Sequence, residues 1–182
     1  MRALILKSNT ACIENINPRS PASSGRFDVI LDFVLECLYG DKSVRKDVTI
    51  YAVLSGCGRT RTIVFRGEEL PYIETEDDLL RLVLSGDVQI LDMGFEELLE
   101  DLSRRGFRLF CLIEDGKDVD KVELPCSNVG FIIGDQDGFT PDDVIIMRRR
   151  NIEFISIGPL PYLSWFCCVF INYVLDRRCR DS

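Results

Sequence analysis

Apolar stretches of strand length alternate along the chain with stretches whose apolar residues recur at helical period. The first apolar run, Ala3 to Lys7, has the length of a strand. The following segment, Gly25 to Tyr39, carries Val29, Phe33 and Leu38 at near-helical spacing. This alternation predicts an α/β fold, in which βαβ units build a mostly parallel sheet flanked by helices.

Polar residues mark the ends of the predicted helices. Ser24 is a candidate N-cap of the first helix, and Gly40 is a candidate stop signal. The segment Thr75 to Ser85 opens with a threonine followed by acidic residues, and Phe95 to Arg105 also has acidic residues near its start and basic residues at its end. Both arrangements suit the helix dipole, so we expect two further helices here.

A β-hairpin interrupts this alternation. Val48 to Leu54 and Thr62 to Phe65 have strand character, and the Gly-rich turn Ser55 to Gly58 begins the short connection between them. So short a connection predicts an antiparallel pair.

Three later segments, Arg108 to Ile113, Val129 to Ile133 and Phe154 to Ile157, are apolar on both faces, as central parallel strands are. Each is followed by a loop rich in Gly, Asp or Pro. Ligands of open α/β sheets bind beyond the carboxyl ends of the strands, so we expect a cofactor site at these three loops.

The stretch Phe154 to Leu175 has no charged residue and resembles a membrane anchor. However, Gly158 to Pro161 contains two prolines that interrupt a helix, which leaves Tyr162 to Leu175 as the longest continuous helix. At ~1.5 Å per residue this helix is about 21 Å long, short of the ~30 Å hydrocarbon core. We therefore expect no membrane segment, but a helix that is buried in the core or covered by a second subunit in a homodimer.

The bulk composition is that of an ordinary globular protein. The 182 residues are 46% hydrophobic and 29% charged, which predicts one domain over 1–182. The net charge of −8 argues against a protein that coats nucleic acid non-specifically, since such proteins release counterions with Lys and Arg. A nucleic-acid partner would have to contact local basic patches.

The chain has no histidine, which removes the commonest general base and the commonest zinc ligand. Its eight cysteines are scattered without a Cys-x-x-Cys pair, and Met1 to Lys7 runs into polar residues without the apolar core of a signal peptide. These features predict a cytoplasmic protein without a disulfide framework.

Several motifs in fixed order resemble one family, the archaeal tRNA pseudouridine-54 N1-methyltransferases. The motifs are Ser23 to Val29, Val44 to Asp47, Phe131 to Phe139, Ile155 to Leu160, Tyr162-Leu163 and Asn172 to Arg177. The resemblance implies an enzyme of the SPOUT class with a C-terminal trefoil knot. It also implies S-adenosyl-L-methionine (SAM) bound in the knot loops, a homodimer with shared active sites, and the T-loop of tRNA as substrate.

The resemblance also implies which residues bind SAM, which needs an apolar slot for adenine and close approach of the backbone. Carried over by position, they are Leu112, Gly134, Ile157, Gly158, Pro159, Leu160, Pro161, Tyr162 and Cys167.

Methylation of N1 requires a group that accepts or orients its proton, and without histidine a carboxylate is the candidate. The candidates are Asp47, Asp28 and Asp135, with Arg26 and Arg45 as substrate-binding residues. For Asp28 and Asp47 the alternative is ion pairing with these two arginines.

The segment Asp135 to Gly138 has some character of a calcium loop, but Phe139 takes the next ligand position. We therefore predict a turn and no metal.

Two departures from the family pattern bear on the function. Trp165 and Phe166 stand where the family commonly has a Ser-His pair, and Gly56 to Arg59 replaces a proline-rich turn. Two rival functions therefore stay open: a SPOUT methyltransferase acting on ribosomal RNA or another base, and a non-catalytic RNA-binding protein.

Overall fold

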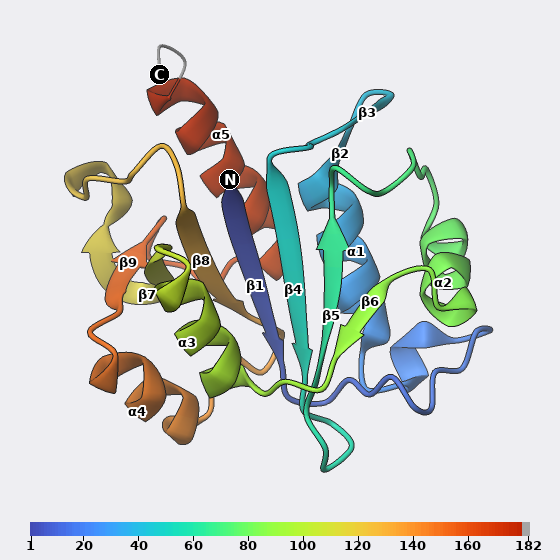
Figure 1. Ribbon diagram of the computed structural model, residues 1–182. Coiled ribbons are helices and arrows are strands. Elements are labelled where there is room, and N and C mark those ends of the chain that lie inside the picture. The colour runs from blue at the N-terminus through green and yellow to red at the C-terminus, as the bar shows by residue number, and fades with distance from the viewer. Residues whose placement is uncertain (180–182) are drawn as a thin grey trace.

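The computed structural model describes residues 1–179, which contain a seven-stranded sheet in the order β6-β5-β4-β1-β8-β7-β9 (Figure 1). The strands of this sheet are β1 (Arg2–Ser8), β4 (Val48–Leu54), β5 (Arg61–Arg66), β6 (Gln89–Leu91), β7 (Arg108–Asp118), β8 (Val129–Gly134) and β9 (Glu153–Ser156). The helices are α1 (Phe27–Leu38), α2 (Glu76–Ser85), α3 (Phe95–Arg104), α4 (Pro141–Arg149) and α5 (Ser164–Arg178). Two 3-10 turns, η1 (Pro21–Ser23) and η2 (Val119–Lys121), and a small hairpin of β2 (Tyr39–Gly40) and β3 (Ser43–Val44) complete the described chain.

The sheet is mostly parallel, as the sequence predicts. β1 pairs in parallel with β4 and β8, and β7 pairs in parallel with β8 and β9. β5 runs antiparallel to β4, which confirms the predicted hairpin. The expectation that β9 is a central strand is wrong, because β9 forms the edge of the sheet next to β7.

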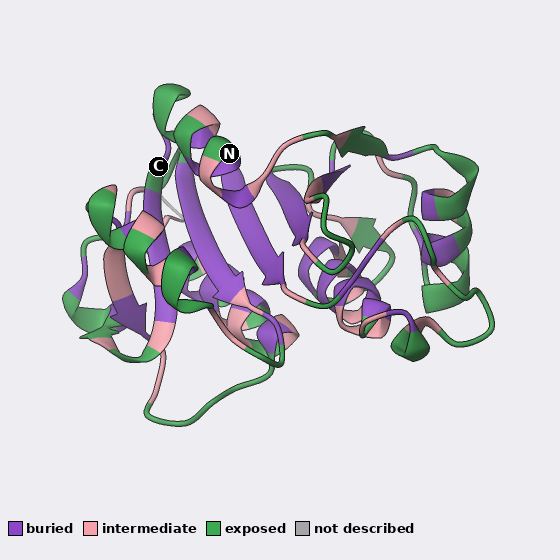
Figure 2. Ribbon diagram, turned by 90° about the horizontal axis from the view of Figure 1, so that it is seen from below, coloured by how far each residue is buried: buried purple, intermediate pink, exposed green. Residues whose placement is uncertain are grey.

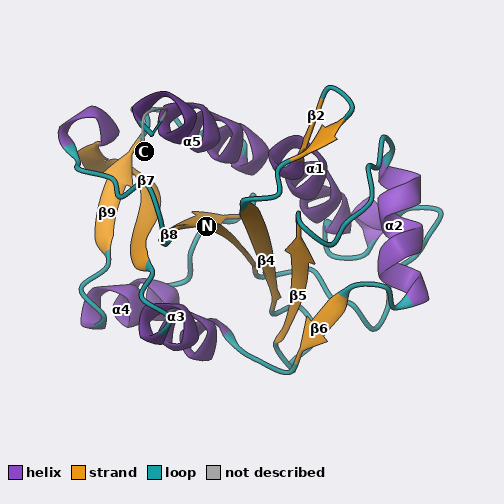
Figure 3. Ribbon diagram, turned by 45° about the horizontal axis from the view of Figure 1, so that its top comes forward, coloured by secondary structure: helices purple, strands orange, loops and turns teal. Residues whose placement is uncertain are grey.

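Helices cover both faces of the sheet, so its central strands are buried on both sides (Figures 2 and 3). Every residue of β1 is buried. Leu4 and Leu6 pack into the cluster formed with α1, α2 and α5, whereas Ala3 and Ile5 pack into the cluster formed with α3 and α4. This double burial explains why β1 reads as a continuous apolar run rather than an alternating one.

The start of α1 differs from the prediction. The helix begins at Phe27 after Arg26, whose φ of 62° is left-handed, and Ser24 does not cap it. The Ser24 hydroxyl instead accepts a hydrogen bond from the backbone N–H of Asn17 at 2.7 Å. Thr75 does cap α2 as predicted, accepting from the Asp78 N–H at 3.2 Å.

Helix α4 is an element that the sequence analysis did not assign. Thr140 accepts a hydrogen bond from the Asp143 N–H at 3.1 Å, and the Asp143 carboxylate accepts one from the Thr140 N–H at 3.0 Å. Pro141 at the first helical position fits this capping box. The start signal was therefore present, but the helix has few buried apolar positions from which to recognise its period.

Helix α5 covers the predicted Tyr162 to Leu175 only from Ser164 onward and packs against α1. No helix within residues 1–179 has the length and apolar content needed to cross a membrane. The outward face of α5 nevertheless keeps Phe166, Val169 and Tyr173 exposed.

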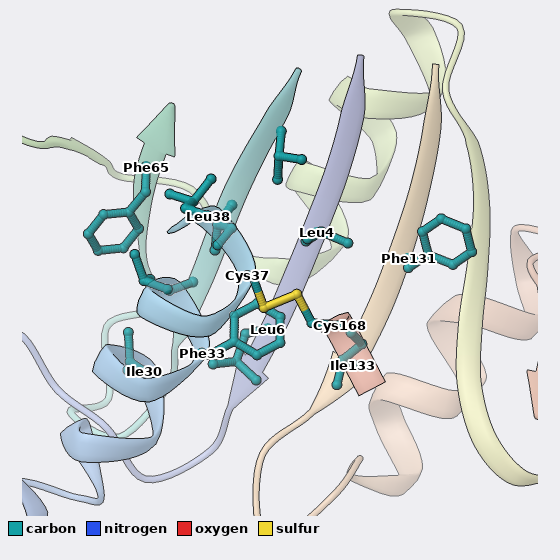
Figure 4. Close-up of a cluster of buried hydrophobic side chains, with 14 of the residues drawn as sticks. Leu4, Leu6, Ile30, Phe33, Cys37, Leu38, Phe65, Phe131, Ile133 and Cys168 are labelled. Carbon is teal, nitrogen blue, oxygen red and sulfur yellow. A yellow bond between two sulfur atoms is a disulfide. The ribbon is translucent and has the colours of Figure 1, made fainter. Parts of the chain in front are cut away.

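Six cysteines of the described chain form disulfides, which contradicts the expectation of a chain without them. The pairs are Cys12–Cys57, Cys37–Cys168 and Cys126–Cys179. Figure 4 shows the second pair inside the core, where it joins α1 to α5. The spacing of the cysteines does not predict these pairs, because the paired residues lie 45 to 131 positions apart in the sequence and are brought together by the fold.

The buried disulfide between α1 and α5 predicts a stability that depends on reductant. It closes a loop of 131 residues, so the double variant Cys37→Ala/Cys168→Ala should lose about 4 to 5 kcal/mol of unfolding free energy. Urea unfolding with and without reductant measures this loss. The control Cys111→Ala removes a buried unpaired thiol without breaking a cross-link. If reductant leaves the wild-type midpoint unchanged, the bridge does not stabilise the protein.

Candidate active site

A cavity of about 300 Å³ opens beyond the carboxyl ends of β8 and β9, beside Leu112 to Glu114 in the middle of β7. This is the edge of the sheet at which the sequence predicts a cofactor site. The lining comprises Leu112, Ile113, Glu114, Ile133, Gly134, Asp135, Gly138, Phe139, Val144, Ile157, Gly158, Leu160, Tyr162 and Cys167.

Seven of the nine predicted cofactor residues line this cavity, and Pro159 and Pro161 do not. The parallel register explains the convergence. Cys111, just before Leu112, pairs with Ile132 of β8, and Leu112 pairs with Ile155 of β9. The ends of β8 and β9 therefore lie beside Leu112, where the regular pairing of β7 is interrupted between Leu112 and Lys117 before the strand continues to Asp118.

Two glycines allow the cavity walls to turn tightly. A Cβ on Gly134 would lie 2.9 Å from the Cα of Gly138, and one on Gly158 would lie 2.6 Å from the Tyr162 hydroxyl. Both distances are too short for a side chain. At these two positions the sequence-based argument for glycine has a steric cause in the structure.

Two carboxylates line the cavity, and they differ in their surroundings. Asp135 is buried, and its carboxylate accepts hydrogen bonds from the backbone N–H groups of Asn9 at 2.9 Å and Asp137 at 3.0 Å. The Gly138 N–H also donates to the Asp135 carbonyl at 3.0 Å, which confirms the predicted turn. Glu114 is exposed at the cavity. The sequence analysis did not name it, because nothing in the pattern separates it from other exposed acids.

Arg26 and Asp28 lie at the same edge of the sheet but outside the cavity lining. Their side chains form an ion pair at 3.0 Å, as the structural alternative predicted. The Thr10 hydroxyl links their turn to the cavity, since it donates to the Gly25 carbonyl at 2.7 Å and accepts from the Gln136 side chain at 3.2 Å. Both residues thus lie next to the Asp135 turn.

Asp47 and Arg45 lie at the opposite edge of the sheet, where β1 and β4 begin. Asp47 pairs with Arg2 at 3.3 Å, and Arg45 pairs with Asp176 at 2.8 Å. The expectation that these two residues pair with each other is therefore wrong. Burial opposes ionisation of Asp176, but hydrogen bonds from Arg45 and Arg2 outweigh it and lower the pKa of this carboxyl. Within one chain neither Asp47 nor Arg45 reaches the cavity.

Trp165 and Phe166, the departures from the family pattern, do not line the cavity. The Phe166 ring lies 5.2 Å from that of Tyr162 and 6.4 Å from that of Phe170, measured between centroids. These substitutions therefore change the outer face of α5 and not the cavity wall.

Cys167 is the thiol of the cavity. Burial, supported by the nearby charge of Glu114, raises the pKa of Cys167 to about 11. At neutral pH it is therefore an uncharged thiol, which suits packing against a ligand better than nucleophilic attack or proton abstraction.

One group of potential metal ligands lies elsewhere in the described chain. The ligand atoms of Cys12, Glu14 and Cys57 all lie within 4.8 Å of one another. Because Cys12 and Cys57 share a disulfide, neither supplies a thiolate in this form.

Comparison with known proteins shows the family to which the chain belongs. The family model described as "Putative SAM-dependent RNA methyltransferase" matches residues 1–179. The solved structure of Archaeoglobus fulgidus Nep1 bound to S-adenosylhomocysteine has a TM-score of 0.63, with 16% identity and 97% of both chains covered. Ribosomal RNA small subunit methyltransferase E from Neisseria gonorrhoeae, bound to SAM, has a TM-score of 0.54 at 10% identity, covering 98% of this chain and 66% of that one. The match over residues 1–179 places the chain in this family of SAM-dependent RNA methyltransferases.

Curated relatives identify the particular family. The tRNA (pseudouridine(54)-N(1))-methyltransferase of Pyrococcus abyssi is 31% identical, with 97% of this chain and 98% of the relative covered. The enzyme of the same name from Methanopyrus kandleri is also 31% identical, with 85% and 81% covered. The chain belongs to the tRNA (pseudouridine(54)-N(1))-methyltransferase family.

The raised pKa of Cys167 predicts slow alkylation at neutral pH. Only the thiolate reacts, so the rate should rise about tenfold per pH unit up to about pH 11. Peptide mass spectrometry after timed iodoacetamide treatment measures the rate at this residue, and Cys167→Ser identifies the labelled peptide. A rate that reaches its plateau near pH 9 would contradict the raised value.

Proposed function

We propose that this protein transfers the methyl group of SAM to N1 of pseudouridine 54 in the T-loop of tRNA. The observation that carries the proposal is the cavity between the middle of β7 and the ends of β8 and β9, which seven of the nine residues that the family resemblance assigned to SAM line. Membership of the family supports the substrate, since the curated relatives are named for this reaction.

The cavity fits SAM in shape and in charge. Leu112, Ile133 and Ile157 supply apolar walls for the adenine, and the glycine turns let backbone groups approach it. The carboxylate of Glu114 lines the cavity, and its negative charge would attract the sulfonium of SAM. When bound, SAM supplies an activated methyl group, while the residues of the chain position the two reactants.

We propose that Asp28 accepts or orients the N1 proton and that Arg26 contacts a phosphate of the RNA. Asp28 lies beside the turn that lines the cavity, whereas Asp135 is held by two backbone N–H groups and Asp47 lies at the other edge of the sheet. The role of Asp135 is then to shape the turn. Arg45 is assigned to the ion pair with Asp176 rather than to the substrate.

We further propose a homodimer that buries the outward face of α5. Phe166, Val169 and Tyr173 lie on this face at helical spacing and are 39%, 37% and 54% exposed. An exposed apolar face of this kind is typical of an interface with a second copy. A dimeric enzyme that acts on tRNA is expected in the cytoplasm.

A C-terminal trefoil knot is proposed on the likeness to SAM-bound methyltransferases and on the path of the chain after β9. The Ser164 hydroxyl at the start of α5 donates to the carbonyl of Gly134 at 2.6 Å, so the chain after β9 comes back to the end of β8. An experimental structure whose chain straightens when its ends are pulled would contradict the knot.

The reaction is tested with two tRNA transcripts that differ in one base. Radiolabelled SAM should methylate the transcript carrying pseudouridine 54 and leave the uridine 54 transcript unlabelled, because uridine N1 is bonded to the ribose. Equal labelling of both transcripts would favour the rival methyltransferase, and no labelling despite SAM binding would favour the RNA-binding protein.

The same assay shows which carboxylate accepts the N1 proton. Asp28→Asn should lower kcat about 100-fold, a typical contribution of a positioned proton acceptor, whereas Asp47→Asn should retain it. Arg26→Ala should raise the KM for tRNA and leave the Kd for SAM unchanged. If Asp28→Asn keeps full kcat, another group accepts the proton.

The dimer is tested by a charge placed on the outward face of α5. Val169→Glu should convert the dimer into a monomer, since a carboxylate cannot be buried unpaired at an apolar interface. Light scattering during gel filtration measures the mass. Ile145→Glu is the matched control, because Ile145 is an apolar residue of α4 that is 51% exposed. A wild-type protein that is monomeric at micromolar concentration would overturn the dimer.

A further inference from the structure

A lysine side chain is buried at the end of the central strand, beside the cavity. The side chain of Lys7 is 5% exposed, and the reaction proposed above does not involve it. Its ammonium lies 2.7 Å from the Asn9 side-chain oxygen, 3.5 Å from a carboxylate oxygen of Asp143 and 5.8 Å from the centre of the Phe95 ring. A buried ammonium needs such partners, because burial without them is costly.

Lys7 fixes the orientation of the Asn9 amide. An ammonium only donates, so Asn9 must turn its oxygen toward Lys7 and its NH₂ group away from it. The NH₂ group donates to the carbonyl of Gly138 at 2.9 Å, and the backbone N–H of Asn9 donates to the Asp135 carboxylate at 2.9 Å. Asn9 thereby holds both ends of the turn that lines the cavity.

Asp143 connects Lys7 to the other end of the same cavity wall. Its carboxylate also accepts a hydrogen bond from the Thr140 N–H at 3.0 Å, and the next residue, Val144, lines the cavity. The Lys7 side chain is therefore connected to the Asp135 end of this wall through Asn9 and to the Val144 end through Asp143.

We infer that Lys7 and Asn9 are positioning residues that hold this wall in the shape that binds SAM. The inference rests on the proposed assignment of the cavity to the cofactor. Neither residue lines the cavity, so both act through the turn. Loss of either should loosen the wall before SAM binds, and binding must then order it again.

The main test compares two asparagines in the full-length protein. Asn9→Ala should weaken SAM binding on the order of tenfold by calorimetry, because the wall is no longer held in place. Asn172→Ala is the matched control at the other end of β1. The Asn172 oxygen accepts from Arg2 at 3.2 Å, and its NH₂ group donates to the Cys37 carbonyl at 3.2 Å. This control should lower the melting temperature and leave the Kd for SAM unchanged.

A second pair of variants separates positioning from folding. Lys7→Met alone leaves the Asp143 charge buried without its partner, which destabilises the fold itself. Lys7→Met/Asp143→Asn removes both charges and keeps an oxygen for the Thr140 cap. The double variant should therefore fold and still bind SAM on the order of tenfold more weakly.

Amide hydrogen exchange without SAM provides an independent readout. The N–H groups of Asp137, Gly138 and Thr140 should exchange faster in Asn9→Ala and in the double variant, but not in Asn172→Ala. Unchanged exchange and unchanged Kd in folded Asn9→Ala would overturn the inference. If the wild type itself fails to bind SAM, the assignment of the cavity fails, and exchange still decides whether Lys7 and Asn9 hold the wall.

Discussion

The parallel pairing of β1, β8, β7 and β9, in that order across the sheet, is the constraint on which the rest of the structure depends. Parallel strands in register end at the same edge of a sheet, so the loops that follow them must meet. Here the pairings of Cys111 with Ile132 and of Leu112 with Ile155 bring the ends of β8 and β9 to the point where the regular pairing of β7 is interrupted. A shift of either register would separate Leu112, Gly134 and Ile157, and the cavity would be lost.

The burial of β1 requires hydrogen-bond partners for two charges, because this central strand carries a cation near each end. Arg2 is 8% exposed and Lys7 is 4% exposed. Each cation donates to the oxygen of an asparagine, and each of these asparagines donates in turn to a backbone carbonyl. At the first end this chain of hydrogen bonds joins α5 to α1, and at the second it holds the cavity wall. The same chemistry thus serves packing at one edge and ligand binding at the other.

The fold could be predicted because the burial of each element leaves a local pattern. Strands buried on both faces read as short apolar runs, and α2 is marked by Thr75 with acids behind it. The edge position of β9 could not be predicted, since strand order depends on pairing between distant segments. The start of α1 could not be predicted either, because it depends on a contact between distant segments. A Cβ on Gly25 would lie 1.8 Å from the Thr10 carbonyl oxygen, a contact that only the folded chain reveals.

In the candidate site, too, the features that depend on local sequence could be predicted, and those that depend on contacts between distant residues could not. Gly134 and Gly158 could be predicted because tight turns after strands require glycine where they stand. The roles of the carboxylates could not, because Asp28, Asp47 and Asp135 look alike in sequence and differ only in what surrounds them. A carboxylate that already accepts two backbone hydrogen bonds, as Asp135 does, is poorly placed to accept a proton from a substrate. Catalytic assignment in a chain without histidine therefore depends on the kind of partner that each carboxylate has. Asp135 is held by backbone N–H groups, whereas the partner of Asp28 is the exposed side chain of Arg26, and neither partner is known until the strands have been paired.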